Sequence, residues 1–214
     1  MSGLLLEESF DLTEAVRNLI TEDDEPVDNI FSEKQQRLLV NALYESWTPP
    51  PPEDAAETTP AQPRPFWAAA NVGIFRSVHL SAVVPNVFVS LDVTAPANLR
   101  NNEERSYYVW EHGKPPEVVI EIVSNRKGKE PDARRRDYAQ HLGHLGVNYY
   151  VVFDPMGELS REMGGEELRI YEIGPIKRYY RREDCELPEI GLSLSLWQGR
   201  FEGNESLWLR WCDA

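Results

Sequence analysis

One acidic residue stands inside an apolar stretch of the sequence. In "PPEVVIEIVSN", residues 115–125, Glu121 is surrounded by the β-branched residues Val118, Val119, Ile120, Ile122 and Val123. That run predicts a strand that is buried on both faces. A carboxylate in such a strand is costly unless it is paired, neutralised or bound to a metal ion. Glu121 is therefore the first residue at which we look for chemistry.

A second stretch, "NVFVSLDV", carries oxygen-bearing side chains at alternate positions. Alternation places one set of residues on the core face of a strand: Val87, Val89, Leu91 and Val93. It places a second set on the opposite face, which we expect to present oxygen ligands: Asn86, Phe88, Ser90 and Asp92. Oxygens from this strand and from the Glu121 strand could hold Mg²⁺, which polarises a phosphoryl oxygen and lowers the pKa of bound water. The alternative is structural, a salt bridge between Glu121 and an arginine such as Arg134.

The N-terminal third contains an acidic arm, a helix and a proline-rich linker. Ser32 and Gln35 form a capping-box pattern, and apolar residues follow at helical spacing, which predicts a helix over 33–46. We assign residues 1–47 to an acidic arm and a helix that packs on the core. Prolines crowd residues 48–65, which predicts an extended or mobile linker.

The remainder, residues 66–214, reads as one strand-rich domain interrupted by a single helix. That helix is expected over 131–143, opened by Pro131 and closed by Gly143. It joins "EVVIEIVS" to "NYYVVFD", so these two strands should be parallel neighbours in a mixed sheet. Further strands are expected at "FWAAANVGIF", "SYYVW", "LRIYEI" and "RYYRR". The tail, "LPEIGLSLSLWQGRF" to "LWLRWC", predicts additional antiparallel strands. The fold class is therefore α/β with a mixed α+β sheet.

Charge and composition limit the partners of the chain. The net charge is −14, but residues 1–65 hold 14 acidic and 4 basic residues and so carry most of it. "NRKGKEPDARRRDYA" and "KRYYRRE" are locally basic and could face phosphate, although ordinary solvated surfaces explain them as well. The sequence lacks a long apolar run, and its two cysteines, Cys185 and Cys212, show no metal-ligand spacing. We expect a cytoplasmic protein with no membrane partner and no small-molecule cofactor.

Four segments resemble a known family: "PNVFVSLDV", "RSYYVWEHGKPPEVVIEIVSNRKGKE", "RRRDYAQHLGHLGVNYYVVFDP" and "LWLRWCDA". They are similar to the Uma-type "putative restriction endonuclease" family, a branch of the PD-(D/E)XK nuclease superfamily. The similarity runs from "VDNIFSEKQQRLL" to the C-terminus. It implies a restriction-endonuclease-like fold, with a central mixed sheet flanked by helices, and often a homodimer. It also implies a phosphodiesterase site for DNA that depends on Mg²⁺ or Mn²⁺.

The resemblance carries over to individual residues, with departures. The aspartate of the family's "PDV" falls on Asn86, and the glutamate of its "EIVS" strand falls on Glu121. The lysine that many of these nucleases place two residues later is absent, and the family's basic residue falls on Arg134, one helical turn before Tyr138. By this resemblance the catalytic residues are Glu121, Arg134 and Asn86, and the metal ligands are Glu121 and Asn86, with Asp92 as a partial compensation for the lost aspartate.

Two functions follow from these departures. The first is a Mg²⁺-dependent DNA endonuclease with an altered site. The second is a catalytically degenerate member that acts as a binding or regulatory module, because an amide attracts a cation less than a carboxylate and a guanidinium does not act as a general base. A third role, assembly through the aromatic C-terminal strands, would need a large apolar interface.

Several other polar residues receive structural interpretations. His141 and His144 have no third ligand at a recognised spacing, so we place them on the surface near the end of the helix. Asp154, followed by Pro155, is expected to close a strand through a turn rather than to catalyse. Glu33 and Gln36 are expected on the solvent face of the first helix, although either could instead face the sheet.

Overall fold

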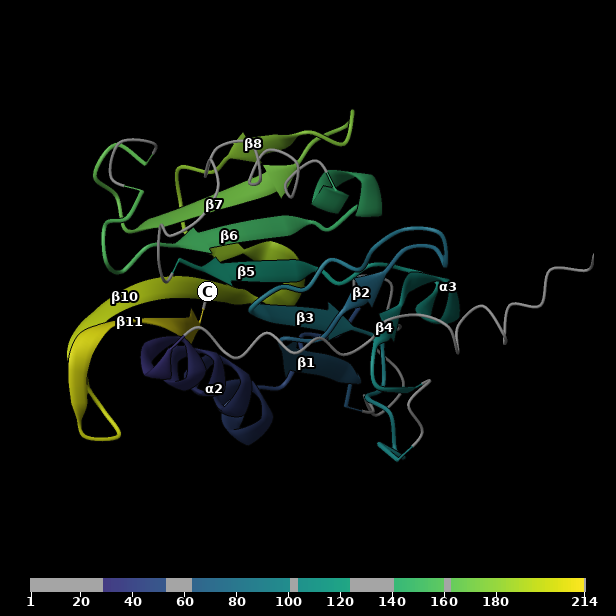
Figure 1. The fold of residues 1–214 in the computed structure, drawn as a ribbon, viewed down its shortest axis with the longest axis horizontal. Coiled ribbons are helices and arrows are strands. Elements are labelled where there is room, and N and C mark those ends of the chain that lie inside the picture. The colour runs from purple at the N-terminus through teal and green to yellow at the C-terminus, as the bar shows by residue number, and fades with distance from the viewer. Residues whose placement is uncertain (1–28, 53–62, 101–103, 124–140, 160–162, 214) are drawn as a thin grey trace, which may run out of the picture.

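The computed structural model describes residues 29–52, 63–100, 104–123, 141–159 and 163–213. A six-stranded sheet forms the centre of the molecule (Figure 1), in the order β1 (Phe66–Ala70), β3 (Val87–Leu91), β5 (Val118–Ile122), β6 (Tyr149–Phe153), β7 (Leu168–Ile173) and β8 (Tyr179–Arg181). β5 and β6 are parallel, as the sequence predicts, and all other neighbours in this sheet are antiparallel. The fold is thus the mixed α+β arrangement that we expected.

The C-terminal tail forms the predicted antiparallel strands. β10 (Leu192–Phe201) and β11 (Asn204–Asp213) make a long hairpin, and β9 (Glu186–Leu187) pairs with β10 after a single 3-10 turn at Pro188–Ile190. Two short strands, β2 (Ile74–Phe75) and β4 (Tyr107–Tyr108), form a separate parallel pair. The predicted strand "SYYVW" is therefore only two residues long, because the chain turns into helix α3 (Val109–His112).

The central sheet separates two apolar layers. One face of β3, with Val87, Val89 and Leu91, packs against helix α2 (Ile30–Ser46) and the β10–β11 hairpin (Figure 1). The opposite face carries Phe88 and belongs to a second layer with Val119, Tyr150 and Leu142. Ser90, also on this face, is fully buried. Our expectation that this face of β3 presents oxygen ligands is thus wrong along the middle of the strand, because a second core covers it.

Helix α2 begins earlier than the capping-box pattern predicts. Asn29 is the N-cap, and its side-chain oxygen accepts a hydrogen bond of 2.9 Å from the backbone N–H of Ser32. Gln35 does not cap the helix. Its amide instead donates to the carbonyl of Leu209 in β11 and accepts from the N–H of Leu209, at 2.8 and 2.9 Å. The helix therefore satisfies part of the free edge of β11, an edge that would otherwise expose unpaired backbone groups.

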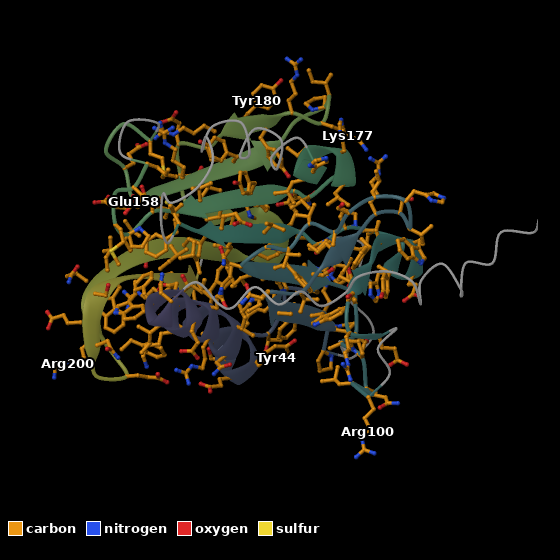
Figure 2. The ribbon with its side chains drawn as sticks, in the orientation of Figure 1. Tyr44, Arg100, Glu158, Lys177, Tyr180 and Arg200 are labelled. Atoms are coloured by element: carbon orange, nitrogen blue, oxygen red, sulfur yellow. The ribbon has the colours of Figure 1, made fainter. Side chains whose placement is uncertain are left out.

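The same helix covers an edge of the central sheet. β1 is the edge strand, and the hydroxyl of Tyr44 both donates to the carbonyl of Ala68 and accepts from its N–H, at 3.0 and 3.1 Å. Figure 2 shows Tyr44 on the part of α2 that lies next to β1. A single helix thus holds the edges of two sheets, which explains why α2 packs on the core.

The second predicted helix ends later than Gly143. Residues 141–145 are helical, and the turn that closes them contains Gly146, with a left-handed φ of 91°. Gly143 has a different purpose: a methyl group added there would lie 2.6 Å from the carbonyl oxygen of Lys177. Gly143 therefore permits close packing against the β7–β8 turn. Residues 131–140 of this predicted helix lie outside the described residues.

Candidate functional site

Asn86 and Glu121 lie side by side on neighbouring strands. The register of β3 and β5 pairs Val87 with Ile120, and one further step places Asn86 opposite Glu121. The side-chain oxygen of Asn86 accepts a hydrogen bond of 2.7 Å from the backbone N–H of Ile122, the residue after Glu121. Side chains at directly opposed positions are about 4.5–5.5 Å apart at Cβ. Two residues 35 positions apart in sequence thus meet at one end of β5.

The orientation of the Asn86 amide limits what it can bind. Its oxygen is engaged by a backbone N–H, and an N–H group requires an acceptor, so the amide nitrogen occupies the other terminal position. That position would hold the second oxygen of the aspartate in the family pattern. Because an amide nitrogen is a donor, it cannot be a ligand for a cation. Asn86 therefore fixes the end of β5 next to Glu121 and offers a cation little.

Asp92 does not join this pair. It follows the last residue of β3, whereas Asn86 precedes the first, so the length of the strand separates them. Both carboxylate oxygens of Asp92 accept from Arg64, at 2.7 Å, and this hydrogen-bonded contact lowers the pKa of the carboxyl group. The backbone at Asp92 is left-handed, with a φ of 57°, so the alternation of the strand is broken there. The assignment of Asp92 as a metal ligand stays a prediction, and its contact with Arg64 does not support it.

Two of the residues that the resemblance assigns to the site, Arg134 and Tyr138, lie outside the described residues. Val123, where many related nucleases carry lysine, continues the β5–β6 pairing, since its N–H donates to the carbonyl of Phe153 at 2.8 Å. Glu121 itself is half-buried on a strand whose other four residues are buried.

Sequence reasoning missed a polar connection from helix α2 to Asn86. Gln36 is buried, and its amide exchanges two hydrogen bonds with the amide of Asn71, at 2.9 and 3.2 Å. The N–H of Asn71 in turn donates to the carbonyl of Asn86, at 3.3 Å. The expectation that Gln36 faces solvent is wrong, although that for Glu33, which is exposed, is correct. The sequence signal for this buried contact was a glutamine on the apolar side of the predicted helix.

A second polar group, also unforeseen, lies at the opposite end of β5. Pro115 and Pro116 precede the strand, and Pro116 has no N–H to donate to β3. Side chains replace it: Glu117 accepts from the N–H of Leu91 at 2.8 Å, and Lys114 donates to the carbonyl of Leu91 at 2.8 Å and pairs with Glu117. This group completes the backbone hydrogen bonding of β3 and so has a structural purpose.

Asp154 closes β6 through a turn, as the sequence predicts. It is fully buried, and its two carboxylate oxygens accept from the N–H groups of Glu158 and Leu159, at 2.9 and 2.6 Å. His141 and His144 are both exposed, in agreement with a surface placement. Within the described ranges, no group of three or more histidine, cysteine, aspartate or glutamate side chains could hold a metal ion.

The residues at the Asn86–Glu121 pair meet the lower limit of what Mg²⁺ requires. Magnesium is commonly bound by one or two carboxylates, with water and substrate phosphate as the other ligands. Glu121 supplies one half-buried carboxylate near the end of β5, and Asn86 supplies an oxygen that already accepts a hydrogen bond. The described residues therefore fit a weakly held ion rather than a tightly held one.

The sheet agrees with the mixed fold that the resemblance implies. Glu121 lies near the end of a central strand, and helix α2 covers one face of the sheet. The model of a family described as "Uma2: Putative restriction endonuclease" matches residues 26–187, and the chain belongs to this family. Curated proteins, by contrast, gave no match. Among the described helices, none has the length and apolar character needed to cross a membrane.

Proposed function

We propose that this chain is a Mg²⁺-dependent DNA endonuclease that hydrolyses phosphodiester bonds. The observation that supports the proposal best is the meeting of Asn86 and Glu121 across β3 and β5, the two strands to which the family pattern assigns its acidic residues. A protein of a nuclease family with a half-buried glutamate at that point has a reason to keep it.

Each residue receives a separate role in this proposal. Glu121 would hold the divalent ion, and Asn86 would fix the backbone of Ile122 and so the direction in which Glu121 points. Arg134 would bind the phosphate as a permanent cation and would not act as a base. When bound, the ion would polarise the phosphoryl oxygen and activate water.

The proposal is tested by incubating supercoiled plasmid DNA with the full chain and Mg²⁺ or Mn²⁺. We expect nicking or linearisation that is lost in Glu121→Gln. Glu205→Gln, an exposed substitution in the C-terminal hairpin, is the matched control and should leave cleavage unchanged. Absence of cleavage with both ions would refute the catalytic proposal, as would cleavage that survives Glu121→Gln.

A second candidate function is supported by the Asn86 amide. Its nitrogen stands where the family pattern has an oxygen, which favours a degenerate member that binds DNA or regulates without cutting it. The double substitution Asn86→Asp with Arg134→Lys tests this idea. If the double variant cuts DNA and the natural chain does not, the degenerate function is supported. Cleavage by the natural chain refutes it.

Two properties complete the proposal. The resemblance supports a homodimer, and light scattering of the full chain in solution would show twice the mass of 24.6 kDa. The free cysteines, Cys185 and Cys212, agree with a reducing compartment, and we propose the cytoplasm. Localisation of the tagged full chain by fractionation tests this part.

A further inference from the structure

We propose that Arg169 and Arg181, which share the carboxylate of Glu166, form a binding site for a backbone phosphate of DNA beside Glu121. The inference rests on the proposed function in one respect, that the ligand is DNA. It requires no cleavage, and it holds equally for a degenerate member of the family.

Two guanidiniums meet on one carboxylate in this cluster. The Nε of Arg169 donates to one oxygen of Glu166 at 2.8 Å, and Arg181 donates to the other oxygen. Each arginine carries one positive charge and Glu166 one negative charge, so the three side chains have a net charge of +1. This positive charge stands out on a molecule whose formal net charge is −14.

The cluster lies on the same face of the sheet as Glu121. Glu121 pairs with Val152 across β5 and β6, and Val152 pairs with Arg169 across β6 and β7. Paired residues project to the same face, so Glu121 and Arg169 belong to one cross-strand row, about 10 Å apart at two strand spacings. Arg181 pairs with Tyr171, two residues along β7 from Arg169, and therefore projects to this face as well.

The surface around the cluster is accessible to a ligand. The side chains of Arg181 and Glu166 are 42% and 41% exposed, and that of Arg169 is 16% exposed. A guanidinium offers several N–H donors in a planar fork that suits phosphate oxygens. Glu166 holds both forks in place before a ligand arrives, which lowers the entropy cost of binding.

The opposite face of the same strand pair provides a natural comparison. Arg182 pairs with two acids, Glu172 and Asp184, and lies over the ring of Tyr149 at 5.9 Å from its centroid. One cation with two carboxylates has a net charge of −1, so this group repels phosphate. Arg182 is an arginine next to Arg181 in sequence, but it lies on the face of the sheet away from Glu121. Its group has a net negative charge, whereas the cluster of Arg169, Arg181 and Glu166 has a net positive charge.

The experiment measures binding of a fluorescent DNA duplex to the full chain by anisotropy, without divalent ions, over a range of salt concentrations. Arg169→Gln and Arg181→Gln should each weaken binding roughly tenfold and reduce the slope of log K against log salt by about 0.9. Arg182→Gln is the matched control and should keep the natural slope. Glu166→Gln should strengthen binding at low salt, because it leaves both cations uncompensated.

The salt slopes separate a binding role from a structural one. If the cluster only joined β7 and β8, Arg169→Gln and Arg181→Gln would destabilise the fold but leave the slope of log K against log salt at its natural value. The inference is overturned if Arg169→Gln and Arg181→Gln keep the natural salt slope, or if the natural chain does not bind the duplex. DNA binding with these slope changes but no cleavage in the plasmid assay would instead refute the proposed endonuclease alone.

Discussion

Replacing Asn86 with aspartate tests the geometry at Glu121 directly. The new carboxylate would keep the acceptor for the N–H of Ile122 and would convert the amide nitrogen into an oxygen. Two carboxylates would then face each other at roughly 5 Å, which costs about 3 kcal/mol at an effective dielectric constant near 20. The stronger, charge-assisted bond to Ile122 offsets part of this cost, leaving about 1–2 kcal/mol. In EDTA, Asn86→Asp should therefore melt about 2–8 °C below the natural chain.

In the presence of Mg²⁺, Asn86→Asp should melt at a higher temperature than the natural chain. An ion present at about 100 times its dissociation constant stabilises the folded state by about 2.7 kcal/mol, which corresponds to a rise of roughly 5–11 °C for a chain of this size. The natural chain, with one carboxylate, should respond much less. Thermal unfolding followed by circular dichroism in EDTA and in saturating MgCl₂ measures both effects. Adding Glu121→Gln to Asn86→Asp should abolish the response to Mg²⁺.

Asn98 provides the matched control, because its side-chain oxygen also accepts from a backbone N–H, that of Arg100, in an exposed loop. Asn98→Asp should neither lower the melting temperature in EDTA nor create a response to Mg²⁺. If Asn86→Asp behaves like Asn98→Asp, then Asn86 and Glu121 do not lie side by side, which would refute the β3–β5 register. An equal response to Mg²⁺ in the natural chain would show that the Asn86 amide does not weaken the site.

Four further predictions concern stability. Asp154→Ala leaves two backbone N–H groups without their acceptors and should lower the free energy of unfolding by about 2–4 kcal/mol in urea titrations, whereas Asp154→Asn should cost less. Gly143→Ala should destabilise by about 1–3 kcal/mol through the clash with the carbonyl of Lys177, and a neutral result in the same titration would contradict this close packing. Burial raises the pKa of Tyr107 to about 12, above its ordinary value of 10.0. The hydroxyl therefore contributes stability that is complete below pH 10 and is lost as the pH rises towards 12. Tyr107→Phe should make this loss of stability with rising pH smaller. Burial lowers the pKa of His112 from 6.5, so its contribution is present above that pH and is lost as the pH falls below it, a decline that should be shallower in His112→Gln.

The sequence by itself determined most of the strands and the odd position of Glu121. Alternation and β-branched runs are local properties, so they locate β3, β5, β6 and the C-terminal hairpin without knowledge of their partners. The order strand, helix, strand also determined that β5 and β6 are parallel, because a crossover connection of that length allows it. The prediction of Asp154 as a turn residue succeeded for the same local reason.

Only the tertiary structure decided which polar side chains meet. Asn86 and Glu121 come together through the register of two antiparallel strands, and a register depends on packing far from either residue. Asp92 lies at the other end of β3 from Asn86 and pairs with Arg64, a contact between residues 28 positions apart that alternation cannot anticipate. Arg169 and Arg181 looked like ordinary surface charges in the sequence. β7, which carries Arg169, pairs with β6, and β8, which carries Arg181, pairs with β7. These pairings place both side chains on the face of the sheet that carries Glu121, because strand pairing brings residues that are distant in sequence next to each other.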